Sequence, residues 1–296
     1  MRLLTLPITE KLSGRTVGNL LKRELKLSGS LISHLKYRPD GILLNGTQTR
    51  TTQKVSAGDL LAANISDDGY VGIPTDLSLG EYILHEDEDI LIFNKPAGME
   101  MHPKSELPNA RSVKSLVCGY LGEGALFHPV NRLDAGTSGI MTAAKNRYIC
   151  DRLRRQLHTD SFIREYIAIT CGVPAQKRGT VTVPIAGAEA MTDYEIIVST
   201  DSHALLRLRL HTGRTHQIRI HMSSLGCPLL GDDRYGDLSE LIDRPALHST
   251  ALHLIHPLTS EPITLSAPPP QDFISAAEQL FGSLHSLTAG NLQIKL

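Results

Sequence analysis

Apolar residues recur at the spacing of one helix face between Val17 and Leu25, which predicts a first helix in this part of the chain. A second short helix is expected from Leu31 to about Tyr37, with Ser30 as the candidate N-cap. That helix must end near Arg38, because the residue before Pro39 is biased away from helical geometry.

The next signals are those of a hairpin followed by a break in the chain. The Asn45-Gly46 pair predicts a tight turn, and a strand is expected after Gly58-Asp59. Residues 67–80 mix acidic residues, glycine and proline without periodicity, so they are interpreted as a linker. The predicted organisation is a small domain at 1–66, this linker, and a large domain at 81–296.

Strand-like apolar runs and one amphipathic helix mix irregularly in the large domain. Strands are expected at 90–93, 166–169 and 205–210, and a helix with arginines around its polar sides at 147–158. Because strands and helices do not alternate regularly, a doubly wound parallel sheet is not expected. The predicted fold class is α+β, with a large mixed or antiparallel sheet flanked by helices.

Composition restricts the setting of the protein. No apolar run in the 296 residues approaches the roughly 20 that a membrane-spanning helix needs. The four cysteines form no CxxC pair and show no disulfide or zinc spacing, which is typical of a cytoplasmic protein with reduced thiols. Nothing in the sequence requires more than a monomer.

The net charge of −1 conceals an asymmetry between the two parts of the chain. Residues 1–64 carry ten Lys and Arg against four Asp and Glu, a net charge of +6, whereas the other residues carry −7. A short basic segment of this kind favours a polyanionic partner, although a solvated basic face would give the same pattern.

One acidic residue occupies an unusual position. In the stretch HPVNRLDAGTSGIMTAAKN, Asp134 follows Arg132 by two positions and precedes Thr137-Ser138-Gly139 and an apolar run. Hydroxyl groups and a glycine at this point are expected to fix the loop. Asp134 is therefore a candidate nucleophile, because a carboxylate is ionised at neutral pH and can bond reversibly to an electrophilic carbon.

Five ordered stretches together carry a resemblance to a known family, and they cover nearly all of residues 81–275. They are EDILIFNKPAGMEMHP, HPVNRLDAGTSGIMTAAKN, REYIAITCG, LHTGRTHQIRIHMSSLGCPLLGDDRYG and ALHLIHPLTSEPITLSAPPPQDF. This order resembles that of the RluA-type pseudouridine synthases. The two helices and hairpin of the first segment resemble an S-four-like RNA-binding module, with Ser28-Gly29 where that module usually has a Ser-Arg pair.

The resemblance implies an RNA pseudouridine synthase, an isomerase that needs no cofactor and no metal. It implies Asp134, Tyr166 and Arg219 as catalytic residues, with Arg219 paired to Asp134 and Tyr166 stacked beneath the target base. Arg132 is expected to enter the space vacated by a flipped uridine.

The stretch TGRTHQIRIH is interpreted as a turn followed by a strand. Alternation along that strand would place Gln217, Arg219 and His221 on one face. Arg214, in the turn, is expected to contact phosphate, and Gln217 is a further candidate for substrate binding. The four arginines and no acid between residues 204 and 221 predict positive potential toward RNA.

Three alternatives limit this interpretation. Asn131 stands where the family usually has His, which is the one feature favouring an inactive RNA-binding or assembly factor. A glycosidase would need a second carboxylate, and none accompanies Asp134 in its motif. His211, His216 and His221 suggest a metal site, but a spacing of five on a strand places neighbours on opposite faces.

The sequence thus predicts isomerisation of uridines in structured RNA, with bacterial ribosomal RNA favoured over transfer RNA by the resemblance. It leaves open which uridine is modified. It also leaves open whether Asp134 attacks the sugar, attacks the base or removes a sugar proton.

Overall fold

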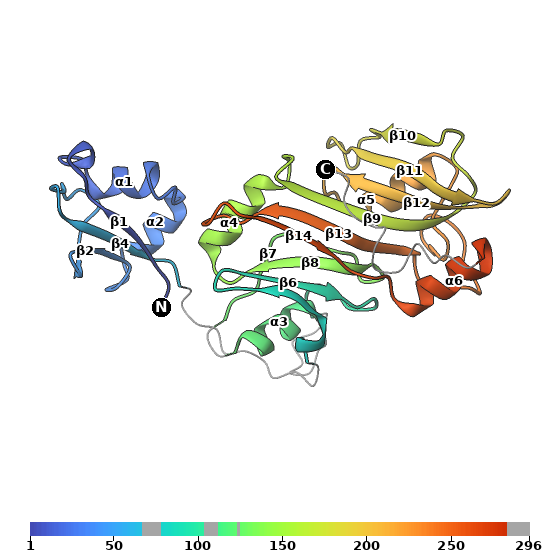
Figure 1. Ribbon diagram of the computed structural model, residues 1–296, viewed down its shortest axis with the longest axis horizontal. Coiled ribbons are helices and arrows are strands. Elements are labelled where there is room, and N and C mark those ends of the chain that lie inside the picture. Colours follow the sequence, from blue (N-terminus) through green and yellow to red (C-terminus); the bar gives the residue numbers. More distant parts are fainter. Residues whose placement is uncertain (67–77, 104–111, 123–124, 283–296) are drawn as a thin grey trace.

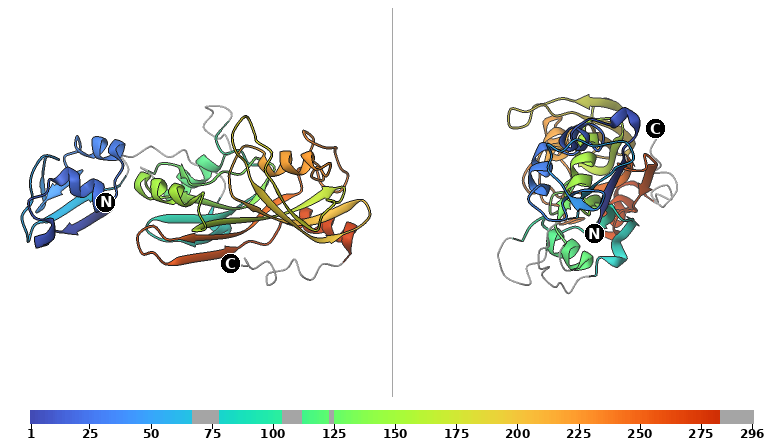
Figure 2. Two further views of the ribbon diagram at one scale, coloured as in Figure 1. Left: turned by 90° about the horizontal axis from the view of Figure 1, so that it is seen from above. Right: turned by 90° about the vertical axis from the view of Figure 1, so that its left-hand side faces the viewer.

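The structure, a computed structural model, describes residues 1–66, 78–103, 112–122 and 125–282. It contains a small four-stranded sheet and a ten-stranded sheet, and Figure 1 shows the small sheet at one end of the molecule, beside α4. The left view of Figure 2 also shows this N-terminal module outside the large sheet. Most of the expected linker, residues 67–77, lies outside the described ranges.

The N-terminal module (residues 1–66) has the predicted two helices and hairpin, with a strand before them that was not predicted. Its elements are β1 (Leu3–Pro7), η1 (Glu10–Leu12), α1 (Val17–Arg23), α2 (Gly29–Leu35), β2 (Ile42–Leu44), β3 (Thr47–Gln48) and β4 (Leu60–Asn64). The strand order is β1-β4-β2-β3, and every pair is antiparallel. Asn45 and Gly46 both have positive φ, as a tight hairpin turn requires. The predicted N-cap was wrong by two residues, because the side chain of Ser28, not Ser30, accepts from the backbone N–H of Leu31.

The large sheet is mixed, as predicted. Its order is β10-β11-β12-β9-β13-β8-β6-β5, with β14 paired to β13 and β7 paired to β8. Its strands are β5 (Ile83–Glu86), β6 (Ile90–Lys95), β7 (His128–Pro129), β8 (Ser138–Ala144), β9 (Phe162–Cys171), β10 (Arg178–Val181), β11 (Thr192–Ser199), β12 (His203–Leu210), β13 (Leu247–Ile255) and β14 (Pro262–Ser266). Only β8 and β13 pair in parallel among the described strands.

Helices cover both faces of this sheet, and alternation along the strands assigns side chains to one face or the other. The helices are η2 (Gly80–Tyr82), α3 (Val113–Leu121), α4 (Arg147–Gln156), α5 (Gln217–Ser224) and α6 (Gln271–Phe281). In β9, Tyr166 and Ala168 pack with residues of α3 and α5, whereas Ile167 and Ile169 pack with residues of α6. No helix in the described ranges has the length and apolar character needed to cross a bilayer.

The predicted strand through TGRTHQIRIH was wrong, because α5 occupies residues 217–224. β12 ends at Leu210, and His216 then adopts a left-handed conformation with φ of 56° as the N-cap of the helix. Ile218 and Met222, four residues apart, turn toward the sheet and join its core. The apolar spacing was helical, and the alternation of polar residues concealed it.

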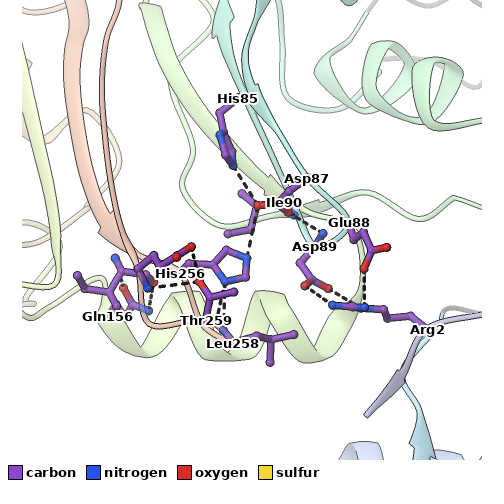
Figure 3. A network of polar contacts seen from close by, with 12 residues as sticks. Arg2, His85, Asp87, Glu88, Asp89, Ile90, Gln156, His256, Leu258 and Thr259 are labelled. Atoms are coloured by element: carbon purple, nitrogen blue, oxygen red, sulfur yellow. Dashed lines mark hydrogen bonds and ion pairs between the residues drawn. The ribbon is translucent and has the colours of Figure 1, made fainter. Parts of the chain in front are cut away.

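Among the described residues, the N-terminal module bonds the large domain at the turn before β6 and at α4. Arg2 donates to both carboxylate oxygens of Asp89, at 3.1 and 2.8 Å, and pairs with Glu88 at the turn before β6 (Figure 3). At α4, the hydroxyl of Tyr148 donates to the carbonyl of Leu25 at 2.7 Å. These contacts join the module to the sheet through the start of β1 and the segment after α1.

His248 is wholly buried between two polar groups. Its Nδ1 lies 2.9 Å from the hydroxyl of Ser138, and its Nε2 lies 3.1 Å from the carbonyl of Ala267. Because a carbonyl only accepts, Nε2 carries the proton and the neutral ring satisfies both partners. Burial lowers the pKa of His248 to about 4.

This environment predicts acid sensitivity of the fold. The folded pKa lies below the unfolded value of about 6.5, so the stabilisation is complete above about pH 6.5 and is lost as the pH falls toward 4. We expect this group to lower the free energy of unfolding by about 2 kcal/mol between about pH 7 and pH 5. Urea unfolding of wild type and His248→Gln at both pH values measures this change in the free energy of unfolding. An equal pH dependence in the two proteins would contradict the assignment to His248.

Candidate active site

A cleft of about 870 Å³ opens beside the loop that carries Asp134. The loops before β8 and after β12 contribute to its wall, together with the end of α4 and the start of α5. Its lining includes six arginines, namely Arg132, Arg154, Arg164, Arg214, Arg219 and Arg244. The acids that line it are Glu100, Asp134, Asp233 and Asp243. The cleft is therefore suited to a polyanion.

The backbone of the Asp134 loop is held by donors from outside the loop. The carbonyl of Ala135 accepts from the backbone N–H of Gly98 at 2.8 Å and from Nζ of Lys95 at 3.2 Å. Lys95 is fully buried and also donates to the carbonyls of Pro96 and Met99. Burial, together with repulsion from a nearby arginine, lowers the pKa of Lys95 to about 8.

A second buried cation holds the next carbonyl of the loop. Nη1 of Arg244 donates to the carbonyl of Gly136 at 3.0 Å. The opposite side of its guanidinium binds both oxygens of Asp272, in the first turn of α6, at 2.7 and 2.9 Å. Burial would raise the pKa of Asp272, but the bonds from Arg244 outweigh it and hold that pKa below its usual value.

A glycine at the start of β8 permits close packing against β13. Gly139 has φ of 116°, and a Cβ there would lie 2.3 Å from the carbonyl oxygen of Ser249. Thr137 donates its backbone N–H to the carbonyl of Asp134 at 3.1 Å. The hydroxyl of Ser138 bonds the ring of His248, which lies in β13.

The carboxylate of Asp134 faces two groups from α5 and its N-cap. Oδ2 lies 4.0 Å from Nη1 of Arg219 and 3.9 Å from Nε2 of His216. These are long contacts, so the carboxylate is near positive charge without being held in a tight ion pair. It remains available to a molecule in the cleft, because 28% of its side-chain surface is exposed.

The tight partner of Arg219 is Asp232, which the sequence interpretation did not identify. Nε and Nη2 of Arg219 donate to the two oxygens of Asp232 at 2.8 and 2.6 Å, and the side chain of Asp232 is fully buried. Burial would raise the pKa of Asp232, yet the bonds from Arg219 hold it below its usual value. Asp232 thus orients the arginine that Asp134 faces.

Tyr235 contacts both Arg219 and His216, the two residues that face Asp134. Its ring lies 5.1 Å from the guanidinium carbon of Arg219, and its hydroxyl lies 3.0 Å from Nδ1 of His216. Burial lowers the pKa of His216, while the charge of Asp134 acts in the opposite direction. His216 was considered in the sequence only as a metal ligand, and its left-handed backbone could not be foreseen from its residue type.

The other predicted site residues differ in how they meet the cleft. Tyr166, Arg132 and Arg214 all line it, and both arginines are exposed. Tyr166 is buried beneath the cleft, and this burial raises the pKa of its hydroxyl. Nε of Arg214 donates to the carbonyl of Glu189 at 3.0 Å, which fixes one side of its guanidinium.

The prediction that Gln217 contacts substrate is not supported by its position. Its Nε2 donates to the carbonyl of Met191 and to Thr192 Oγ1, both at 3.0 Å, while its Oε1 accepts from Thr212 and from the backbone of Arg214. Two residues apart on a helix, Gln217 and Arg219 point to opposite sides. Gln217 therefore anchors the loop before α5 to β11.

Asn131 has a structural role in the loop before Asp134. Its Oδ1 accepts from the backbone N–H of Thr142 in β8 at 2.8 Å, and the residue is buried. Asn131 thus fixes this loop to β8 where the family usually has a histidine.

Three side chains could approach a metal ion away from the cleft. The candidate ligand atoms of Asp87, Asp89 and His256 lie within 4.8 Å of one another. Both oxygens of Asp89 already bind Arg2, and Nδ1 of His256 accepts from two backbone N–H groups of the following turn (Figure 3). We assign this group to the contact between module and sheet.

Comparison with known proteins gives a consistent result. Residues 89–224, which include Asp134, Tyr166 and Arg219, match the family described as RNA pseudouridylate synthase. A Bacillus subtilis protein named as an RNA pseudouridine synthase, YjbO, is 35% identical, and the match covers 84% of this chain and 94% of that one.

Two further relatives agree with it. The ribosomal large subunit pseudouridine synthase D of Haemophilus influenzae is 36% identical, with 67% of this chain and 70% of that one covered. The solved structure of human RNA pseudouridylate synthase domain containing 4 superposes with a TM-score of 0.56 at 26% identity. The superposition covers 68% of this chain and 94% of the human one.

The support of the Asp134 loop can be tested on stability. Arg244→Gln removes the charge-assisted bonds to the partly exposed carboxylate of Asp272 and to the carbonyl of Gly136, so we expect the free energy of unfolding to fall by about 2 kcal/mol. Arg178→Gln, which breaks an exposed pair with Glu195, is the matched control and should cost under about 1 kcal/mol. Equal losses in denaturant titrations of the two variants would refute this role for Arg244.

Proposed function

Because this chain belongs to the RluA-type family of RNA pseudouridine synthases, we propose that Asp134 is the nucleophile with which it isomerises uridines of structured ribosomal RNA. The family supplies the reaction, an isomerisation of uridine to pseudouridine in RNA. One observation supports Asp134 as the nucleophile. Its carboxylate is open to a cleft lined by arginines, and it lies on a loop whose carbonyls are held by two buried cations.

The reaction exchanges one bond for another without net oxidation. The bond from uracil N1 to ribose C1′ breaks, the base turns, and a new bond forms from C5 to C1′. C5 loses a proton and N1 gains one, so no group donor or redox partner enters the balance. A carboxylate that bonds reversibly to an electrophilic carbon suits the step during which the base is detached.

The surrounding residues receive roles from their places around Asp134. Arg219 presents positive charge and N–H groups, and His216 presents a ring nitrogen, each at about 4 Å, a distance that a bound nucleotide can shorten. Exposed Arg132 is proposed to fill the space left by the flipped uridine, and Arg214 to contact phosphate. Tyr166 is proposed to stack on the target base and to receive the C5 proton.

The N-terminal module is proposed to be an S-four-like RNA-binding domain that contacts RNA outside the cleft. Arg15, Arg23 and Lys26 are exposed and line a shallow hollow beside α1. We propose that the protein acts as a monomer in the cytoplasm. Ribosomal RNA is favoured over transfer RNA because a relative covering two thirds of this chain is named for the large ribosomal subunit.

The nucleophile is tested by Asp134→Asn, which preserves size and removes the charge. We expect isomerisation to fall by at least about a thousandfold while RNA affinity stays within about twofold. Pseudouridines are mapped at single-nucleotide resolution in ribosomal RNA from cells with the protein, without it, and with the variant. A site that is lost without the protein but restored by Asp134→Asn would disprove the assignment.

Tyr166→Phe separates stacking from proton transfer. The ring is retained, so RNA affinity should be unchanged, whereas loss of a proton acceptor should lower turnover by about 10²–10⁴-fold. Single-turnover rates on ribosomal RNA from cells lacking the protein provide the measurement. Full activity of this variant would leave Tyr166 with a stacking role alone.

A further inference from the structure

Three arginines are buried among the described residues, and they differ in how their charge is balanced. Arg219 binds both oxygens of Asp232, and Arg244 binds both oxygens of Asp272. Arg164 is 5% exposed, and no carboxylate of the described part of the chain pairs with it. This difference points to a partner from outside the protein, because an uncompensated buried charge is costly.

The hydrogen bonds of Arg164 within the protein are few and long. Nη2 donates to the carbonyls of Leu157 and Thr212, both at 3.4 Å, and Nε has no partner. Burial lowers the pKa of Arg164, which is the direction expected for a cation that lacks an anion. A guanidinium has five N–H donors in a rigid fork, so most of its capacity is unused.

Arg164 lies at the cleft on the same face of the sheet as Tyr166. Both residues line the cleft, and they are two positions apart in β9, which places their side chains on one face. The separation of such neighbours along a strand is about 7 Å. This is of the order of the distance between a nucleoside base and a phosphate of its own backbone.

The loop after β12 packs against the guanidinium of Arg164 at Gly213, which has no side chain there. A Cβ at position 213 would lie 3.0 Å from Nη1 of Arg164, so any side chain larger than that of glycine would press on the guanidinium. A second hollow of about 500 Å³ lies beyond this loop and shares Leu157, His158 and Arg214 with the cleft. A strand of RNA leaving the cleft toward this hollow would pass over Gly213.

We propose that Arg164 forms a phosphate subsite, in which its guanidinium and that of Arg214 receive one backbone phosphate of the RNA next to the target uridine. The inference rests on the proposed function for its substrate, but not on the role of Asp134. A phosphate supplies the missing negative charge and accepts two parallel N–H bonds from one guanidinium. It would also fix the distance between the RNA backbone and the Tyr166 ring.

The first test uses inorganic phosphate as the ligand and thermal unfolding as the readout, so it is independent of isomerisation. Phosphate at constant ionic strength should raise the Tm of wild type and of Arg178→Met, but not that of Arg164→Met. In the absence of phosphate, Arg164→Met should unfold at the wild-type temperature or above, because an unbalanced buried charge has been removed. A structural arginine would instead lower the Tm when replaced.

The second test measures the affinity for an unmodified ribosomal RNA transcript over a range of salt concentrations. Loss of one phosphate contact should reduce the slope of log K against log salt by about 0.7–0.9, whereas Arg178→Met should leave the slope unchanged. Gly213→Val keeps Arg164 but covers its guanidinium, so this variant should lose both the phosphate-induced rise in Tm and the same part of the salt slope. It replaces Arg164→Met as the test if that variant fails to fold.

The proposal is overturned if Arg164→Met, or Gly213→Val in its place, keeps the wild-type phosphate response or the wild-type salt slope. Failure of the Asp134 assignment would appear differently, as isomerisation by Asp134→Asn with both arginine tests unaffected.

Discussion

The geometry of the cleft depends on two buried cations that hold adjacent backbone carbonyls. The Asp134 loop leads into β8, the strand between β13 and β6 in the sheet. Lys95 is the last residue of β6 and binds the carbonyl of Ala135, while Arg244 precedes β13 and binds that of Gly136. One cation therefore comes from β6 and the other from the segment before β13, the two strands that flank β8. An interior that excludes water makes such charge-assisted bonds strong, so the loop is rigid where the chemistry needs it.

This arrangement also explains how a chain of net charge −1 presents a cationic cleft. Buried Asp232 and surface-exposed Asp272 bind and orient Arg219 and Arg244, so their charges do not face the cleft as free acids. Arg132 and Arg214 remain exposed at its wall. Net charge is a sum over the whole chain, whereas a nucleic acid responds to the local electrostatic potential. Because acids pair with buried arginines, the cleft can have positive potential although the net charge is slightly negative.

Local signals in the sequence predicted the elements that local chemistry controls. The Asn45-Gly46 turn, the helix at 147–156 and the apolar run of β6 all follow from residue types at short spacing. The helix at 217–224 was missed because a polar alternation competed with the i, i+4 pair of Ile218 and Met222, and the packing against the sheet decided between them.

The sequence predicted the residues of the candidate active site less completely than it predicted the secondary structure. Asp134, Arg219 and Tyr166 come together in the cleft as the resemblance implied. Asp232, Arg244 and Asp272 act through partners 13 to more than 100 positions away along the chain, so no local spacing indicated them. Asp233 also lines the cleft, so the absence of a second acid in the motif did not exclude one in space. Family membership, not geometry, therefore decides against a glycosidase.

Helix α4 connects the two parts of the protein that are proposed to hold RNA. Near its start, Tyr148 bonds the carbonyl of Leu25 in the N-terminal module, and just past its end Leu157 lines the cleft. Nine residues at 1.5 Å each separate these points by about 14 Å. The pairing of Arg2 with Asp89 provides a second attachment, which restricts rotation of the module about the first. An RNA engaged at both places must therefore present its target uridine at a set distance from a second contact. A folded RNA would meet that condition at far fewer positions than a flexible strand. If the module binds RNA as proposed, its fixed attachment would therefore contribute to the choice of substrate.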